Sequence, residues 1–149
     1  HKACPQCGRQ ATARWVKREL SKLIGAPYFM VTFTIPQQLR SLCLHRPKEL
    51  YSLLLKASAQ TLHDITRTTL KNDHLQLYLT SVLHTWGQNL HHHPHIHCVV
   101  PAGGLAPDGS RWVSSSPHFF LPVRVLSRLF RGKFLALLLQ AGSRPANFT

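Results

Sequence analysis

The segment at residues 91–100, HHHPHIHCVV, constrains the fold of this chain more than any other, because histidines alternate with other residues just before an apolar run. Side chains of an extended strand point alternately to its two faces, so His93, His95 and His97 are expected to share one face. Neutral imidazole nitrogens bind divalent cations, and two imidazoles set two residues apart can converge on one ion. The pattern predicts a metal-binding strand, and a histidine-rich surface turn is the alternative.

The composition is strongly basic, with 18 Lys and Arg residues against 5 Asp and Glu residues and a formal net charge of +13. A charge of this size favours an extended anionic partner, most commonly a nucleic acid backbone, with an anionic membrane surface as the alternative. No apolar stretch is long enough to span a bilayer and the start lacks a signal-peptide pattern, which predicts a cytoplasmic protein. The 149 residues, 44% of them hydrophobic, suffice for one core.

Both ends of the chain lack the features of a complete protein. It begins with His1 rather than methionine, and residues 142–149 form a polar end without a recognisable terminating element. We therefore expect this chain to be the central part of a longer protein, to which its function would belong.

The four cysteines divide into one pair and two single residues. Cys4 and Cys7 form the C-x-x-C-G sequence of a zinc knuckle, in which two thiolates bind one tetrahedral ion and the glycine permits a tight turn. Only His1 is a nearby candidate for a further ligand, so the missing ligands are expected upstream. A redox C-x-x-C is the alternative, but no buried strand precedes the pair. Cys43 and Cys98 are expected to be small buried side chains.

Hydrophobic periodicity predicts a mixture of helices and strands. Helices are expected over residues 12–24, 47–70 and 122–140, and strands over residues 28–35, 78–86, 93–100 and 111–113. The short connection at residues 87–89 predicts an antiparallel hairpin that ends in the histidine strand. Since Pro94 has no N–H, pairing of that strand is expected to begin at His95. The order of elements predicts an α+β domain with one antiparallel sheet flanked by helices.

The last predicted helix has a basic outward face. Arg124, Arg128 and Arg131 follow one another at helical spacing, so their guanidinium groups could contact successive phosphates of a DNA backbone. Trp86 and Trp112, near predicted loops, could stack on unpaired bases. An ordinary solvated helix face is the alternative.

Several of these segments together resemble one known family. They are HTWGQN at residues 84–89, HHHPHIHCVVPAGGLAPDG at 91–109, PYFMVTFTIP at 27–36, FFLPVRVLSRLFRGKF at 119–134, and the leading CPQCG. Over nearly its whole length the chain closely resembles the rolling-circle insertion-sequence transposases, whose nuclease belongs to the HUH superfamily. The resemblance implies a ferredoxin-like core over residues 25–149, truncated before the tyrosine segment. It also implies that residues 1–24 are a linking helix and the end of a zinc-binding region that includes Cys4 and Cys7.

The resemblance further implies a metal-dependent transposase reaction, with His95 and His97 as the metal-binding motif. In this family a tyrosine cleaves single-stranded DNA, leaving a 5′ phosphotyrosine that strand transfer later resolves. Family members carry this tyrosine on a helix after the histidine motif, whereas residues 79–149 of this chain contain no tyrosine. The three tyrosines present, at 28, 51 and 78, fit packing roles. The chain is therefore expected to bind metal and DNA without completing the reaction.

The sequence leaves more than one choice for the metal and for its third ligand. Imidazole ligands favour Zn, Mn, Fe or Ni over Mg, whereas the resemblance implies Mg or Mn, so Mn satisfies both conditions. Candidates for the third ligand are, in falling order, His93, His84 and Gln88. A noncatalytic zinc-containing DNA-binding module is the alternative function. The two functions differ in whether an ion bound at the histidine strand is needed for DNA cleavage once the tyrosine segment is restored.

Overall fold

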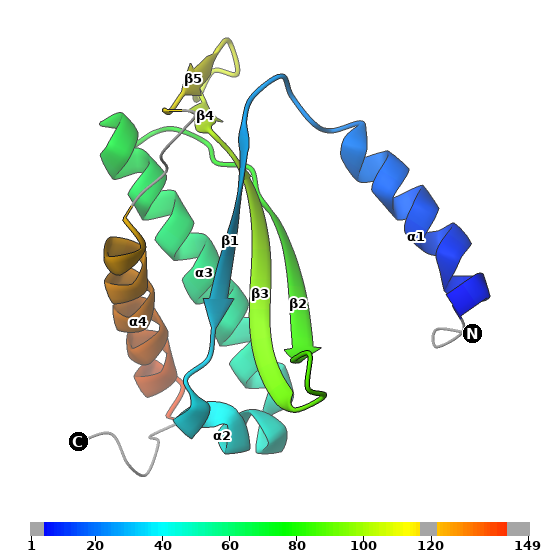
Figure 1. Cartoon of the computed structure of the whole chain (residues 1–149). Coiled ribbons are helices and arrows are strands. Elements are labelled where there is room, and N and C mark those ends of the chain that lie inside the picture. The colour runs from blue at the N-terminus through cyan, green and yellow to red at the C-terminus, as the bar shows by residue number, and fades with distance from the viewer. Residues whose placement is uncertain (1–4, 117–121, 143–149) are drawn as a thin grey trace.

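The computed structural model describes residues 5–116 and 122–142, with the side chains of residues 5–7 left out (Figure 1). The elements, in chain order, are α1 (Pro5–Leu20), β1 (Tyr28–Thr34), the 3-10 turn η1 (Gln37–Leu39), α2 (Arg40–His45), α3 (Pro47–Leu70), β2 (Thr80–Trp86), β3 (His92–Pro101), β4 (Gly103–Leu105), β5 (Trp112–Ser114) and α4 (Val123–Gln140). This mixture confirms the α+β class expected from the sequence.

The histidine strand β3 lies in the middle of a three-stranded antiparallel sheet with the order β1-β3-β2. β2 and β3 form the expected hairpin, and β1 pairs with the other edge of β3. β4 and β5 form a separate two-stranded sheet at one end of the long strands (Figure 1). The central position of β3 means that both of its backbone edges are paired, so its side chains are placed by two neighbouring strands.

The pairing of β2 with β3 contains a bulge. His84 lies opposite His95, but Trp86 lies opposite His92, so two residues of β3, His93 and Pro94, face one residue of β2. Regular pairing of β3 with both of its neighbours begins at His95, as expected, and beyond the bulge one further pair joins Trp86 and His92. Pro94 still contributes its carbonyl oxygen, which accepts a hydrogen bond from the Ile35 backbone N–H at 3.3 Å.

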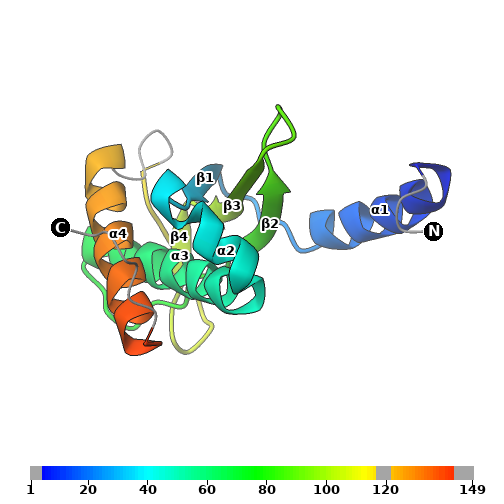
Figure 2. The ribbon, with the colours of Figure 1, turned by 90° about the horizontal axis from the view of Figure 1, so that it is seen from below.

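Helices α3 and α4 cover one face of the sheet, which we call the covered face (Figure 2). Every second residue of the strands enters the core on this side, as the ring contact between Phe33 of β1 and Phe130 of α4 shows, with centroids 4.8 Å apart. The other, open face carries the remaining side chains, and Met30 on the edge strand β1 is 73% exposed. The buried core comprises Phe33, Ile96, Cys98, Val100, Leu50, Leu54, Leu62, Phe134 and Leu138, among others.

The longest helix has the bounds that the sequence predicts. Pro47 is its first residue, where a missing N–H is harmless, and Lys71 ends it in the left-handed conformation with φ of 51°. Helix α1 begins at Pro5 rather than at residue 12, and a proline is favoured at the first position of a helix. Cys7 and Gly8 are therefore helical in backbone, not part of a tight turn.

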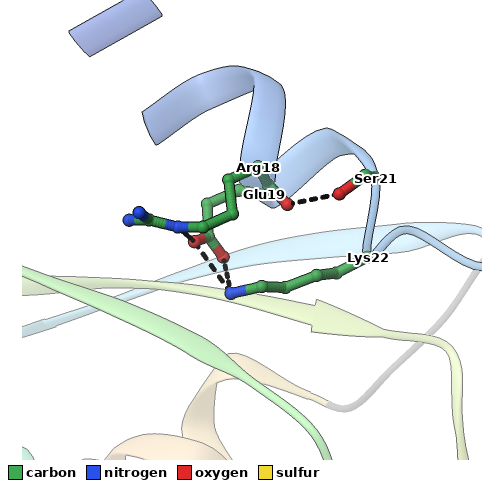
Figure 3. A network of polar contacts seen from close by, with 4 residues as sticks. All are labelled: Arg18, Glu19, Ser21 and Lys22. Carbon is green, nitrogen blue, oxygen red and sulfur yellow. Dashed lines mark hydrogen bonds and ion pairs between the residues drawn. The ribbon is translucent and has the colours of Figure 1, made fainter. Parts of the chain in front are cut away.

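Polar contacts surround the end of α1 (Figure 3). The Glu19 carboxylate accepts from Lys22 Nζ at 2.9 and 3.0 Å and lies 3.5 Å from Arg18 Nε, while Ser21 Oγ donates to the Arg18 carbonyl at 2.8 Å. Lys22 thereby lowers the pKa of Glu19. Exposed pairs of this kind stabilise a helix end only slightly. Within the described residues, no helix has the length and apolar character needed to cross a membrane.

Candidate metal centre

Three histidines meet on the open face of the sheet. His84 comes from β2, and His95 and His97 come from β3; the potential ligand nitrogens of the three residues all lie within 4.8 Å of one another. The strand register produces this cluster, because His84 lies directly opposite His95 and diagonally opposite His97. Their ring centroids are 4.6 to 5.2 Å apart. We call these three residues the histidine cluster.

Hydrogen bonds orient two rings of the histidine cluster. His95 Nδ1 lies 2.6 Å from the carbonyl oxygen of His93. A carbonyl can only accept, so this Nδ1 carries the proton and the neutral ring keeps a lone pair on Nε2. His97 Nδ1 lies 3.0 Å from Thr32 Oγ1 on β1. Such second contacts are typical of metal-binding histidines, whose ring orientation they fix.

The surroundings of His97 favour its neutral imidazole. Burial lowers the pKa of His97, and the neighbouring His84 and His95 lower it further, since a second positive charge beside them is unfavourable. A neutral ring is the form that binds a cation, so His97 retains its ligand form to a lower pH than a free histidine.

His93 lies beside the cluster but is engaged elsewhere. Its ring centroid is 5.2 Å from that of His95, while its Nδ1 is 2.7 Å from Nη2 of Arg40. A guanidinium can only donate, so His93 accepts through Nδ1 and carries its proton on Nε2, leaving no free lone pair for a metal. Burial and the charge of Arg40 lower its pKa. The structure thus groups His84, rather than His93, with His95 and His97, and it leaves Gln88 in the exposed hairpin loop.

The donor set of the cluster is entirely nitrogen. The only group of three or more potential metal-binding residues in the described part of the chain consists of these histidines, with no carboxylate among them. Three imidazoles in this arrangement fit Mn, Zn, Fe or Ni better than Mg, which prefers oxygen ligands. The open face leaves room for further ligands such as water or a phosphate oxygen.

The other predicted site residues lie apart from the cluster. Arg124, Arg128 and Arg131 are exposed on α4, which packs on the covered face. Trp86 is 59% exposed near the end of the hairpin, whereas Trp112 helps line an apolar cavity of about 730 Å³ between the end of α1 and the strands. Cys4 and the side chain of Cys7 lie outside the described residues.

Each of the three tyrosines has its own hydrogen-bond partner. The Tyr28 hydroxyl accepts from the Ile24 backbone N–H at 2.9 Å, and the Tyr78 hydroxyl donates to Gln76 at 3.2 Å. The Tyr51 hydroxyl lies 2.9 Å from His92 Nε2, and burial raises its pKa. The packing roles expected from the sequence agree with the partly buried positions of Tyr28 and Tyr51, whereas Tyr78 is 55% exposed.

Two family models match separate parts of the chain. Residues 1–35 match the family described as "Transposase zinc-binding domain", and residues 79–146 match the family described as "Putative transposase". The second match includes the whole histidine cluster. The first extends beyond α1 into β1.

Curated relatives agree with these families. "Putative transposase y4qJ" of Sinorhizobium fredii (strain NBRC 101917 / NGR234) is 46% identical over 132 residues, which are 89% of this chain and 33% of the relative. "Transposase for insertion sequence element IS801" of Pseudomonas savastanoi pv. phaseolicola is 32% identical over 117 residues, covering 78% of this chain and 27% of the relative. The chain thus spans about a third or less of the length of these relatives.

Solved structures of the conjugative relaxase TrwC share the fold. The metal-bound complex with oriT DNA superposes with a TM-score of 0.58 at 17% identity, covering 76% of this chain and 43% of the relaxase chain. The metal-free complex gives a TM-score of 0.59 at the same identity. In sequence the chain is thus similar to insertion-sequence transposases over most of its length, and the fold around the histidine cluster is similar to that of the relaxase.

Proposed function

We propose that this chain supplies the metal-binding nuclease part of a DNA transposase that nicks and transfers single-stranded DNA. The observation that carries the proposal is the histidine cluster, whose three imidazoles converge on the open face of the sheet. The formal charge of +13 supports a DNA partner, because a basic surface attracts the phosphate backbone. The metal-bound, DNA-complexed relaxase neighbours and the transposase relatives support it further.

In the proposed reaction, this chain binds and orients the scissile phosphate. A divalent ion at the cluster would withdraw charge from a non-bridging phosphate oxygen and so favour in-line attack by a phenolate. The side chains of this chain act before that step: His84, His95 and His97 offer their nitrogens, and Thr32 fixes the ring of His97. The open sheet face admits an extended strand of DNA to the phosphate position.

The attacking tyrosine is proposed to be none of the three in this chain. Each of their hydroxyls is hydrogen-bonded within the fold, and none of them belongs to the segment after the histidine motif. The chain by itself is therefore expected to bind metal and DNA without forming a covalent phosphotyrosine.

Calorimetric titration of Mn²⁺ into the chain tests the proposed metal site. His84→Ala, His95→Ala and His97→Ala should each weaken Mn²⁺ binding by about 100-fold or more, because each removes one of three ligands. His74→Ala, in an exposed loop, is the matched control and should bind as the unmodified chain does. His93→Ala should also retain affinity. Undiminished binding in the three cluster variants would contradict the proposal and favour the noncatalytic DNA-binding alternative.

We further propose that residues 1–24 are the end of a zinc-binding region and residues 25–149 the nuclease core, with Cys4 and Cys7 as zinc ligands. The zinc-binding family match at residues 1–35 supports zinc in this region. A protein that includes residues upstream of His1 should contain about one zinc per chain, and Cys4→Ser should lower this content, because one thiolate ligand is removed. Cys43→Ala, in the core, is the control. An equal zinc content per chain in the longer protein and in this chain would contradict the proposal that Cys4 and Cys7 form only half of a zinc site.

A further inference from the structure

Arg40 has no anionic partner within the described residues. Its Nη2 donates to His93 Nδ1 at 2.7 Å, and its Nε is buried with no acceptor in the described part of the chain. The ion pairs formed in that part of the chain include other arginines but not this one. Arg46, six residues further along, is a useful contrast because its Nη2 lies 2.6 Å from Glu49 Oε2.

The partly buried guanidinium of Arg40 reduces the free energy of unfolding unless an anion is bound beside it. A partly buried charge loses hydration and needs either an opposite charge or a full set of hydrogen bonds to compensate. Among the described residues, the Arg40 side chain contacts a neutral imidazole and still has guanidinium donors to offer. Arginine is well suited to phosphate, since its planar donors can bind two oxygens of the same group.

Arg40 also lies at the edge of the histidine cluster. The His93 ring, which it contacts, has its centroid 5.2 Å from that of His95, a member of the cluster. Since Arg40 occupies Nδ1 of His93, the proton of the neutral ring is on Nε2, which makes this atom a further hydrogen-bond donor.

We propose that Arg40 and His93 form an anion subsite for a phosphodiester, one phosphate along the DNA strand from the phosphate bound at the histidine cluster. The subsite rests on the proposed function, because it assumes that the cluster binds the neighbouring phosphate. It gives Arg40 a role in positioning the strand rather than in binding the metal. It also gives His93 a role distinct from that of a third metal ligand.

Short thymidine oligonucleotides separate the two phosphate positions. The Mn²⁺-loaded chain would be titrated calorimetrically with a dinucleotide that carries one phosphodiester and with a trinucleotide that carries two. The second phosphodiester should raise affinity by about 10-fold or more, beyond the statistical factor of about two, because it gains charge-assisted hydrogen bonds. In Arg40→Gln this gain should fall to the statistical factor, while the affinity for the dinucleotide and for Mn²⁺ stays unchanged.

Two further variants make the result specific. Arg46→Gln removes a nearby arginine that already has a carboxylate partner, and it should keep the full gain from the second phosphodiester. Arg40→Lys keeps the charge but loses the planar donors, and it should keep part of the gain. An equal gain in the unmodified chain and in Arg40→Gln would overturn the subsite. A metal-loaded chain that binds neither oligonucleotide would instead contradict the proposed function.

Discussion

At the scale of single residues, the candidate metal centre depends on atoms that are not themselves ligands. The His93 carbonyl and the Thr32 hydroxyl each contact an Nδ1, and so orient the rings of His95 and His97 before any ion binds. A neutral ring held in the right tautomer avoids the cost of reorientation on binding. These contacts come from the backbone of β3 and from a different strand, β1.

Thr32→Val tests the role of the second contact. Valine has nearly the shape of threonine but no hydroxyl, so the ring of His97 would lose its partner while the strand stays intact. We expect the affinity for Mn²⁺ to fall by about 10-fold, in the range that removal of such outer hydrogen bonds typically costs.

Calorimetry measures the effect, and Thr68→Val on α3 is the matched control. The Thr68 hydroxyl donates to the Asp64 carbonyl on an exposed helix surface, far in sequence from the cluster. This variant should bind Mn²⁺ normally. Equal affinity in Thr32→Val would mean that the ring of His97 needs no hydroxyl to hold its orientation.

The sequence predicts only part of the histidine cluster. Two histidines separated by one residue in an apolar strand can be recognised because strand periodicity is strictly local. His84 lies eleven positions from His95, and whether it shares their face depends on the register of the hairpin. The bulge shifts this register by one residue, so loop length alone predicts the wrong partner. Because the sequence does not contain this register, it favours His93 over His84 as the third metal ligand.

At the scale of helices and strands, elements with strong local signals were predictable. The helix Pro47–Leu70 and the strand Tyr28–Thr34 have clear periodicity and end at proline or turn residues. The short elements η1, α2 and β4 were missed, because a few residues carry too little periodicity to separate a turn of helix or a short strand from a loop. Their positions follow from packing against β3 and pairing with β5.

The exposed arginines of α4 are the second proposed contact with DNA. These arginines lie on a helix that packs on the covered face, whereas the histidine cluster is on the open face. A DNA strand that contacts both would have to pass around an edge of the sheet. If it does, replacing Arg124, Arg128 and Arg131 with Gln should weaken binding to single-stranded DNA of every sequence. The slope of log affinity against log salt should flatten by up to about two, at roughly 0.7 for each phosphate that the variant no longer neutralises.

Fluorescence anisotropy over a series of salt concentrations measures this slope. Replacing Arg9, Arg14 and Arg18 of α1 with Gln removes the same charge from a different helix and serves as the control for net charge. An unchanged slope in the α4 variant would confine the DNA contacts to other surfaces, first of all the open face beside the histidine cluster.

At the scale of the whole molecule, titrating groups limit the pH range in which the fold is stable. Burial lowers the pKa of His63, and the pKa values of His93 and His97 are lowered as well, from an ordinary value of 6.5. Below that pH the unfolded chain binds these protons more readily than the folded chain does. Stability is therefore complete above about pH 6.5 and falls as the pH falls below it.

The buried thiols set the alkaline limit. Burial raises the pKa of Cys43 from 9.0 to about 11 and also raises that of Cys98. Above pH 9 the unfolded chain releases these protons while the folded chain retains them, so stability falls as the pH rises. We expect the free energy of unfolding, measured with urea, to be highest between about pH 7 and 9.

Two variants assign the limits to particular groups. Cys43→Ala should flatten the loss of stability above pH 9, and His63→Gln should flatten the loss below pH 6.5, each without changing the opposite limb. An alkaline limb that stays equally steep in Cys43→Ala would show that other groups control it.

The bulge in β3 also restricts how the length of this chain can change during evolution. Because faces alternate with each residue, deleting one residue between the bulge and Cys98 would reverse the parity of the strand, turning histidines into the core and Ile96 towards solvent. The five-residue tip of the hairpin, residues 87–91, carries no such constraint, because its length does not affect the alternation in β3. Functional relatives should therefore vary in the length of the hairpin tip. Within β3 they should tolerate only insertions or deletions of an even number of residues.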